Sequence, residues 1–171
     1  MDFSVEFIAL CDRMEQGQDR VFASRRNAAV AGRMAALVSE MNMTEERKIL
    51  GIMSTGMTSH AHEYRLLFAA PTLDAAGLAD WWRYALDAEQ ALVQADERHS
   101  FSLVSVVLVA ERVEKEAAKR LKRLSAERKY GANGWSSIRF AVVEIGGGKV
   151  YTNREGETLR GILLPFLQKN T

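Results

Sequence analysis

The sequence has one cysteine, two prolines and no long apolar run, and each scarcity excludes a class of protein. The single cysteine, Cys11, cannot form an intrachain disulfide, which argues against a small disulfide-stabilised secreted domain. The longest apolar run, residues 106–110, is far shorter than the roughly 20 residues of a membrane span. The first six residues carry acids where a signal peptide carries basic residues. We therefore expect a soluble, cytoplasmic protein.

The bulk composition is that of an ordinary globular domain. Hydrophobic residues make up 47% and charged residues 26% of the 171 residues, which excludes an intrinsically disordered chain. A chain of this length buries about 70% of the surface that its unfolded form exposes. We expect one domain over residues 1–171, with a helical segment at 1–56 and a sheet portion at 60–171.

The first 56 residues carry apolar positions at helical spacing. Phe3, Phe7, Leu10 and Met14 recur on one helix face, and Gly17 ends this first predicted helix.

Two more helices are predicted after the first. The pattern over residues 22–41 is rich in alanine, the best helix former, and Gly32 inside it suggests close contact with another helix. Thr44 is placed to cap a third helix over residues 44–56, with acidic residues in its first turn.

From residue 63 the pattern alternates between strands and helices in the order β-α-β-α-β-β. Thr72 is placed to cap the first of these helices, and glycines 146–148 predict a tight hairpin turn. For residues 158–167 we favour a strand over a short helix. The fold class is therefore α+β, or α/β, with helices on a mixed sheet of four to five strands. The predicted strands are residues 63–70, 101–110, 138–145 and 150–152, and the predicted helices follow at 72–92 and 111–129.

The three histidines form a candidate metal site. His60 and His62 point to the same side of a strand, because side chains alternate with period two. His99 precedes its own strand, so the starts of two parallel neighbours would bring all three imidazoles together. Three imidazoles are a ligand set for zinc or iron. The spacing matches no specific metal motif, so exposed histidines without a metal are the competing interpretation.

Charge is unevenly distributed along the chain. Residues 1–60 have a net charge of −1, residues 61–110 of −4 and residues 111–171 of +6, which sum to the +1 of the whole chain. A basic third of this kind can bind an anionic ligand. No nucleic-acid-binding motif accompanies it. The candidate ligand residues are Lys119, Arg123, Lys149 and Arg154.

Aromatic residues supply a candidate interface. Trp81 and Trp82 are adjacent on a predicted helix, about 100° apart, so the two rings cannot occupy one core position. Tryptophan is enriched at interface hot spots. With Phe3 and Phe7 of the first helix, Trp81 is our candidate contact in a homodimer, the commonest type of oligomer.

The sequence leaves the function unknown and favours a non-enzymatic interaction or assembly module that forms homo-oligomers. The first alternative is a metal-dependent enzyme or metal-binding protein that uses His60, His62 and His99. The second alternative is binding of an anionic ligand by the basic third. A cofactor is not implied, apart from a divalent metal under the first alternative.

Overall fold

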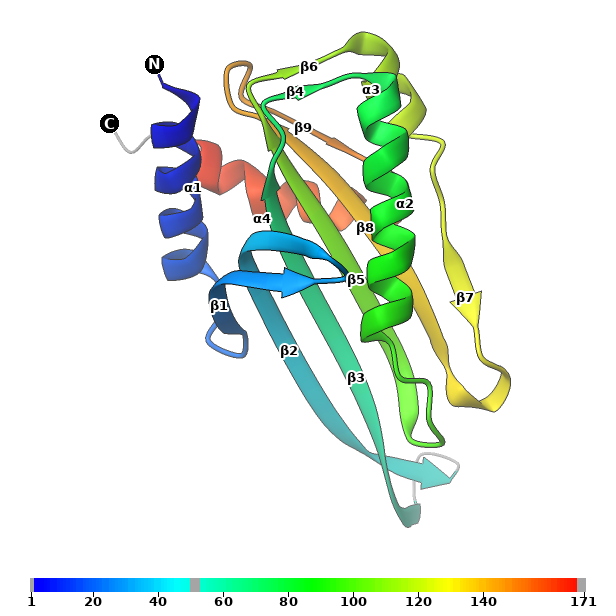
Figure 1. Ribbon diagram of the computed structural model, residues 1–171. Helices are drawn as coiled ribbons and strands as arrows, with labels where there is room; N and C mark the ends of the chain where they lie inside the picture. Colours follow the sequence, from blue (N-terminus) through cyan, green and yellow to red (C-terminus); the bar gives the residue numbers. More distant parts are fainter. Residues whose placement is uncertain (1, 50–52, 169–171) are drawn as a thin grey trace.

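The structure is a computed structural model that describes residues 2–49 and 53–168 as one large mixed sheet with helices on both faces. Figure 1 shows α2 in front of the strands and α4 behind them, with α1 at the side. The helices are α1 (Phe3–Gly17), α2 (Ala75–Leu92), α3 (Lys115–Leu121), α4 (Glu157–Leu167) and the short 3-10 helix η1 (Gly131–Asn133). The strands are β1 (Ala23–Val30), β2 (Arg33–Ile49), β3 (Met53–Ala69), β4 (Thr72–Leu73), β5 (His99–Ala110), β6 (Arg112–Val113), β7 (Glu127–Lys129), β8 (Trp135–Glu144) and β9 (Lys149–Thr152).

The large sheet has the strand order β1-β2-β3-β5-β8-β7, with β9 also paired to β8. Its centre is parallel, since β3 pairs with β5 and β5 with β8 in that sense. Its flanks are antiparallel: β1, β2 and β3 form a meander, and β7 and β9 pair with opposite ends of β8. The short strands β4 and β6 make a separate parallel pair.

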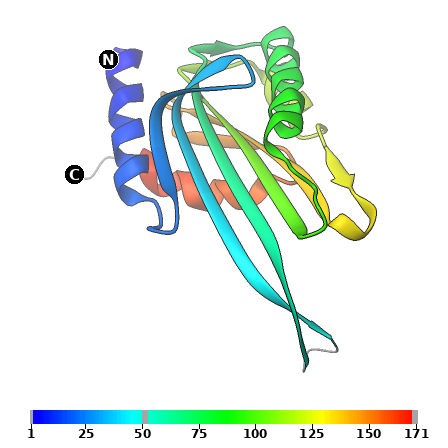
Figure 2. The same ribbon diagram turned by 60° about the horizontal axis from the view of Figure 1, so that its bottom comes forward.

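The hairpin of β2 and β3 extends beyond the rest of the sheet. Each strand has 17 residues, whereas β1 has eight and pairs only as far along β2 as Glu40. β5 likewise pairs with β3 only from His60 onward. Figure 2 shows the outer part of this hairpin as a two-stranded ribbon that protrudes from the body.

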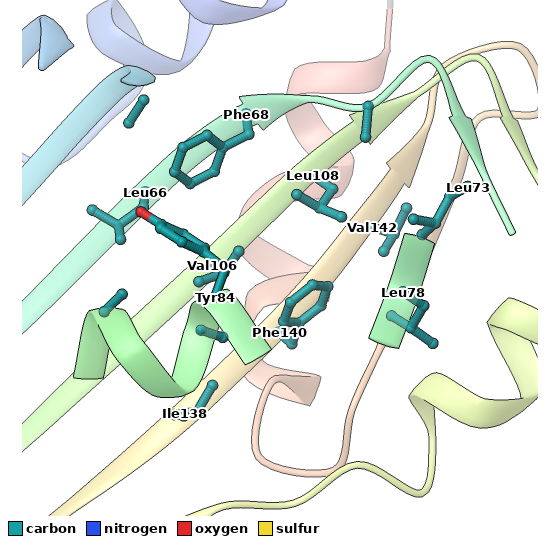
Figure 3. Close-up of a cluster of buried hydrophobic side chains, with 14 of the residues drawn as sticks. Leu66, Phe68, Leu73, Leu78, Tyr84, Val106, Leu108, Ile138, Phe140 and Val142 are labelled. Atoms are coloured by element: carbon teal, nitrogen blue, oxygen red, sulfur yellow. The ribbon is translucent and has the colours of Figure 1, made fainter. Parts of the chain in front are cut away.

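A large core lies on the side of the sheet covered by α2, which we call the α2 face. Figure 3 shows Phe68, Leu108 and Phe140 projecting from three neighbouring strands toward α2. Trp81 and Trp82 of α2 also pack here, with ring centroids 4.9 Å from Phe68 and 6.0 Å from Phe140, respectively. Both tryptophans therefore contribute to the chain's own core.

A second core lies on the opposite side, which we call the cleft face, and α1 and α4 cover it. Leu10 and Cys11 of α1 are buried there, with Leu159 and Leu163 of α4. Strand residues Leu37, Leu67, Val107 and Ala141 lie beneath them. Among the described residues, no helix is long and apolar enough to cross a membrane.

The predicted α+β class, with helices packed on a mixed sheet, is confirmed. The strands predicted at residues 63–70, 101–110, 138–145 and 150–152 correspond to β3, β5, β8 and β9. The glycine turn at 146–148 joins β8 to β9 as an antiparallel hairpin. The large sheet has seven strands, more than the four or five expected.

The prediction of helices over residues 1–56 is right for α1, which ends at Gly17, and wrong for residues 22–41. Those residues form the β1–β2 hairpin, whose two-residue turn is Ala31 and Gly32 with φ of 47° and 83°. Turns with two positive φ angles match the twist of paired strands. Nothing lies within 4 Å of a Cβ placed on Gly32, so the glycine serves the turn and not a helix contact. Strand pairing outweighs the weak helix preference of the alanines.

The helix predicted over residues 44–56 is also wrong where the structure describes it. Residues 44–49 belong to β2 and residues 53–56 to β3, while Leu50 and Ile52 lie outside the described residues. The sequence pattern predicts a short amphipathic helix here, whereas the chain forms a long antiparallel ribbon.

Three boundaries in the second half also differ from expectation. The cap of α2 is Asp74 and not Thr72, with its carboxylate accepting from the amide of Gly77 at 2.7 Å. The helix predicted over residues 111–129 is confined to α3, and residues 127–129 form β7.

The strand favoured for residues 158–167 is a helix, α4. Leu159, Ile162, Leu163 and Phe166 have the i, i+3, i+4, i+7 spacing of one helix face, and this face packs on the sheet. Pro165 lies in the last turn of α4 without ending it. This proline had suggested the end of a strand.

Candidate functional site

A cleft of about 500 Å³ lies on the cleft face of the described structure, between the sheet and the ends of α1 and α4. Its floor comes from β2, β3 and β5, through residues such as Leu37, Leu67 and Val107. Its walls come from α4, through residues such as Ile162, from the end of α1, and from the segment after it, residues 18–22. Most of these side chains are apolar. The volume lies within the range of pockets that hold small organic ligands.

The two covering helices meet at their C-terminal ends. The Arg13 guanidinium of α1 donates to the carbonyl oxygen of Phe166 in α4 at 2.9 Å. A Cβ on Gly17 would lie 2.5 Å from the Phe166 ring, so the glycine allows this close approach. Figure 2 shows α4 running across behind the strands and reaching α1 at the edge of the sheet. This junction closes one end of the cleft.

A polar row crosses the cleft face beside the apolar floor. Ser39, Arg65, Ser105 and Arg139 are register partners on β2, β3, β5 and β8 in turn. Register partners on adjacent strands project to the same side of a sheet. Ser39 and Arg65 also line the cleft, so the row begins inside it and continues toward β8.

Arg65 is held in position by an acid and an aromatic ring. Its Nε donates to the buried carboxylate of Glu63 at 2.9 Å, and its guanidinium carbon lies 4.2 Å from the centre of the Phe22 ring. Arginine offers five N–H donors, and the Glu63 contact uses the one at Nε. The terminal nitrogens of Arg65 therefore remain as donors at the cleft.

Arg139 and Ser105 lack partners among the described residues. Arg139 is half-buried and forms no hydrogen bond or ion pair there, and burial lowers the pKa of its guanidinium. The Ser105 hydroxyl is fully buried and has no hydrogen-bond partner in the described structure. Buried polar groups are normally paired, so these two donors call for an explanation.

A second polar cluster lies on the α2 face and contains the predicted histidines. His60 and His62 share a side of β3, as the period-two pattern predicts, and the centres of their rings are 6.5 Å apart. The rings of His62 and His99 are stacked, also with 6.5 Å between centres. Burial, with the neighbouring His99 and His60, lowers the pKa of His62.

The hydrogen bonds of these histidines occupy several ring nitrogens. His99 Nδ1 donates to the carbonyl oxygen of Asn133 at 2.5 Å, and its Nε2 lies 2.8 Å from Ser102 Oγ. His62 Nδ1 lies 2.5 Å from Asn42 Oδ1. Among the described residues, no group of three or more His, Cys, Asp or Glu side chains is arranged to hold a metal ion. The three-histidine metal site stays a prediction.

A buried glutamate network lies next to the histidines. Glu89 of α2 is 3% exposed and accepts hydrogen bonds from the hydroxyls of Tyr130, at 2.9 Å, and Ser136. Arg128 lies 3.5 Å from its other carboxylate oxygen. The sequence offers no signal for this network, because Glu89 reads as an ordinary surface position of a helix.

The residues of the proposed basic site are only partly brought together. Lys119 and Arg123 lie close enough to Glu116 to help lower the pKa of its carboxyl, after the larger effect of the Arg120 hydrogen bond. Lys149 is the first residue of β9, and Arg154 follows the end of this strand. Binding of an anion by these four residues stays a prediction.

The predicted interface residues also contribute to the chain's own folding. Phe3 and Phe7 stack with 6.1 Å between ring centres and pack against the cleft-face core. The Arg33 guanidinium lies 4.3 Å from the centre of the Trp81 ring. Their role in a homodimer stays a prediction.

Sequence reasoning missed the polar row, although the sequence contains a signal for it. Arg65, Ser105 and Arg139 each interrupt an otherwise apolar strand core. One polar residue in a buried strand is common. Three such residues indicate a polar site once the strand register places them side by side. The alignment depends on the pairing of β3, β5 and β8, which the sequence leaves open.

Comparison with known proteins gives a family and no described activity. Neither a curated protein nor a solved structure matches the chain. One family model, a domain of unknown function (DUF8052), matches residues 8–164 and so includes most of the cleft, the polar row and the histidines. The chain therefore belongs to the DUF8052 family.

Proposed function

We propose that this protein is a non-enzymatic binding module that holds an elongated apolar small molecule in the cleft beneath α1 and α4. The observation that carries the proposal is the cleft of about 500 Å³ with a mainly apolar lining. Protein interiors are close-packed and contain few voids larger than a water molecule. Apolar cavities that do exist tend to stay dry and to accept apolar guests.

The cover of the cleft supports reversible binding. Among the described residues, the α1–α4 junction has one polar link, from Arg13 to the Phe166 carbonyl, beside apolar contacts. The segment between α1 and β1 carries Phe22, which packs over Arg65 at the cleft. A ligand can therefore enter after small shifts of side chains and helix ends, without breaking the sheet.

The test is a titration with N-phenyl-1-naphthylamine, a neutral apolar probe whose fluorescence rises in a dry site. We expect saturable binding of about one probe per chain. Ile162→Trp, which adds bulk to a half-buried wall residue, should weaken binding at least about tenfold, roughly the effect of 1.4 kcal/mol.

Leu164→Trp is the matched control, because Leu164 lies on the same helix, is 38% exposed and does not line the cleft. It should leave binding of the probe unchanged. Absence of saturable binding, or equal loss in both variants, would refute the proposal.

A second proposal retains the homodimer expected from the sequence. Val5 and Ile8 lie one helical turn apart on α1 and are 59% and 58% exposed, and exposed apolar pairs of this kind suit a helix contact. Sedimentation velocity over a hundredfold concentration range should reveal a dimer that Val5→Glu with Ile8→Glu dissociates. A monomer at every concentration would exclude it.

We also propose that the protein is cytoplasmic. The support is that its one cysteine, Cys11, is free and buried, as suits a reducing compartment. Localisation of a fluorescent fusion in the source cell would test this.

A further inference from the structure

The charge of the cleft defines the head group of its ligand, an inference that depends on the proposed function. We propose that the ligand is an amphiphile with a single carboxylate, which Arg65 and Arg139 bind together with the Ser105 hydroxyl. Its alkyl chain then lies in the apolar cleft. Three features of the polar row support this: an excess of donors, an excess of one positive charge, and the position of both relative to the cleft.

The polar row offers hydrogen-bond donors without matching acceptors. Arg139 has no partner among the described residues, the buried Ser105 hydroxyl has none either, and Arg65 has only the Glu63 contact. Ser39, at the end of the row, lies 3.1 Å from the hydroxyl of Ser24. Arginine has no acceptor to offer, so the missing acceptors must come from outside the row. Carboxylate oxygens are acceptors of this kind, and their pairing with guanidinium is charge-assisted.

The charges of the row and its paired acid add up to one uncompensated cation, while the exposed Asp19 also lines the cleft, on the segment after α1. Arg65 and Arg139 contribute two positive charges, and Glu63 contributes one negative charge. Glu63 and Arg65 are also the two charged groups that act on Arg139. A net charge of +1 suits a monoanion such as a carboxylate better than a phosphate dianion. An unpaired half-buried cation is costly in the empty protein, and a bound anion would relieve that cost.

The row lies where a head group would emerge from the cleft. Arg65 lines the cleft, and Arg139 lies two strands away across Ser105. Two strand spacings place the two arginine backbones roughly 10 Å apart, a gap that long side chains can close around one carboxylate. The apolar floor at Leu67 and Val107 belongs to the next register row on the same face, toward α4. The alkyl chain of a ligand whose carboxylate binds the row therefore lies under the helices.

The experiment compares decanoate with decanol, a pair with the same chain and different head groups. Each competes with N-phenyl-1-naphthylamine for the protein, at concentrations below those at which decanoate forms micelles. We expect decanoate to displace the probe at a concentration at least about tenfold lower than decanol, the effect of one charge-assisted contact of about 1.4 kcal/mol.

Arg139→Met should remove the preference for decanoate while leaving the affinities for decanol and for the probe unchanged. Ser105→Ala should reduce the preference by a smaller factor of about two to five. Arg83→Met is the matched control, because Arg83 is an exposed arginine of α2 and the change removes the same charge. It should leave the preference intact. Urea unfolding without ligand should show that Arg139→Met folds normally, since Arg139 has no partner to lose in the described structure.

The two proposals fail in different ways. If the probe binds, and decanoate and decanol displace it equally, the head-group inference is wrong and the apolar cleft stands. A preference for decanoate that survives Arg139→Met would overturn the assignment to Arg139. If neither the probe nor either amphiphile binds, the proposed function falls, and the head-group inference falls with it.

Discussion

The two faces of the sheet treat their polar groups differently. On the α2 face, Glu89, Tyr130 and Ser136 bind one another under a helix, and His99 bonds to Ser102 and to the Asn133 carbonyl. On the cleft face, Arg139 and Ser105 lie unpartnered within the described structure, beside a cleft. Glu89 Oε2 on the α2 face also lacks a hydrogen bond, but it lies 3.5 Å from Arg128 in an ion pair. In the described structure, no such partner lies beside the Ser105 hydroxyl or the Arg139 guanidinium, so the cleft face has capacity for a ligand.

The comparison indicates that the α2 face mainly stabilises the fold and that the cleft face mainly serves binding. Aromatic and aliphatic side chains from the strands and from α2 pack together on the α2 face (Figure 3). The cover of the cleft face comes from two helices that leave space between themselves and the sheet. Substitutions should therefore affect mainly folding on the first face and binding on the second.

The largest expected difference is between two buried leucines. Leu108→Ala on the α2 face should lower the free energy of unfolding by about 3–5 kcal/mol, because it leaves a closed cavity in a filled core. Leu67→Ala on the cleft floor should cost less, about 2–3 kcal/mol, because its outer side already faces open space and loses fewer contacts. Urea unfolding of both variants tests this, and equal losses would contradict the comparison.

The next largest difference in stability is expected between polar groups on the two faces. Glu89→Ala should lower the free energy of unfolding by about 2–3 kcal/mol, because it leaves the Tyr130 and Ser136 hydroxyls without an acceptor. Glu89→Gln keeps an acceptor and should cost clearly less. Arg139→Met on the cleft face should stay within about 0.5 kcal/mol of the parent. A large loss for Arg139→Met would show that Arg139 is a structural residue.

A third prediction concerns the helix that covers the cleft. Burial raises the pKa of the Cys11 thiol to about 11, from 9.0 for the free group. The thiolate fraction at pH 8 should then be about 100-fold lower than in the unfolded chain, and the reaction with a disulfide reagent should be slower by at least that factor. Stopped-flow absorbance measures both rates. Leu10→Ala, which weakens the packing of α1, should speed the reaction. A wild-type rate near that of the unfolded chain would mean that α1 does not stay packed on the sheet.

The smallest effect is a pH dependence at the start of α4. Hydrogen bonds from Arg160 and Thr152 lower the pKa of Glu157 from 4.5 to about 2. A folded-state pKa below the unfolded value stabilises the protein above about pH 4.5, and this contribution is lost as the pH falls toward 2. Thermal unfolding should show wild type slightly more stable than Glu157→Gln at pH 7, with the gap closing by pH 2. A gap independent of pH would refute this assignment.

The sequence predicts those parts of the fold whose signal is local and strong. Residues 101–110 are apolar on both sides of the strand, and they form the central strand β5. Residues 22–41 mislead because alanine prefers helix, whereas pairing of β1 with β2, and of β2 with the following strand β3, decides the outcome. The turn signal was present as Ala31 and Gly32, but a two-residue turn identifies a hairpin only when both flanking strands are recognised.

The candidate site likewise has a part that the sequence predicts and a part that it does not. The shared side of His60 and His62 follows from period-two alternation within one strand and is predicted correctly. The row of Arg65, Ser105 and Arg139 requires the register of three strands from distant parts of the sequence. The cleft further requires the docking of α4, a segment that reads as a strand if Pro165 is given too much weight.

The protruding ribbon of β2 and β3 has a consequence for amide hydrogen exchange. Beyond Glu40 the outer edge of β2 has no neighbouring strand among the described residues, and before His60 the same holds for the outer edge of β3. Only the amides that bond across the ribbon are protected, so in this segment they should alternate between slow and fast exchange along each strand. The same two strands should protect amides on both edges inside the sheet, where β1 and β5 lie alongside. The boundary between the two regimes would mark, residue by residue, where the ribbon leaves the body of the protein.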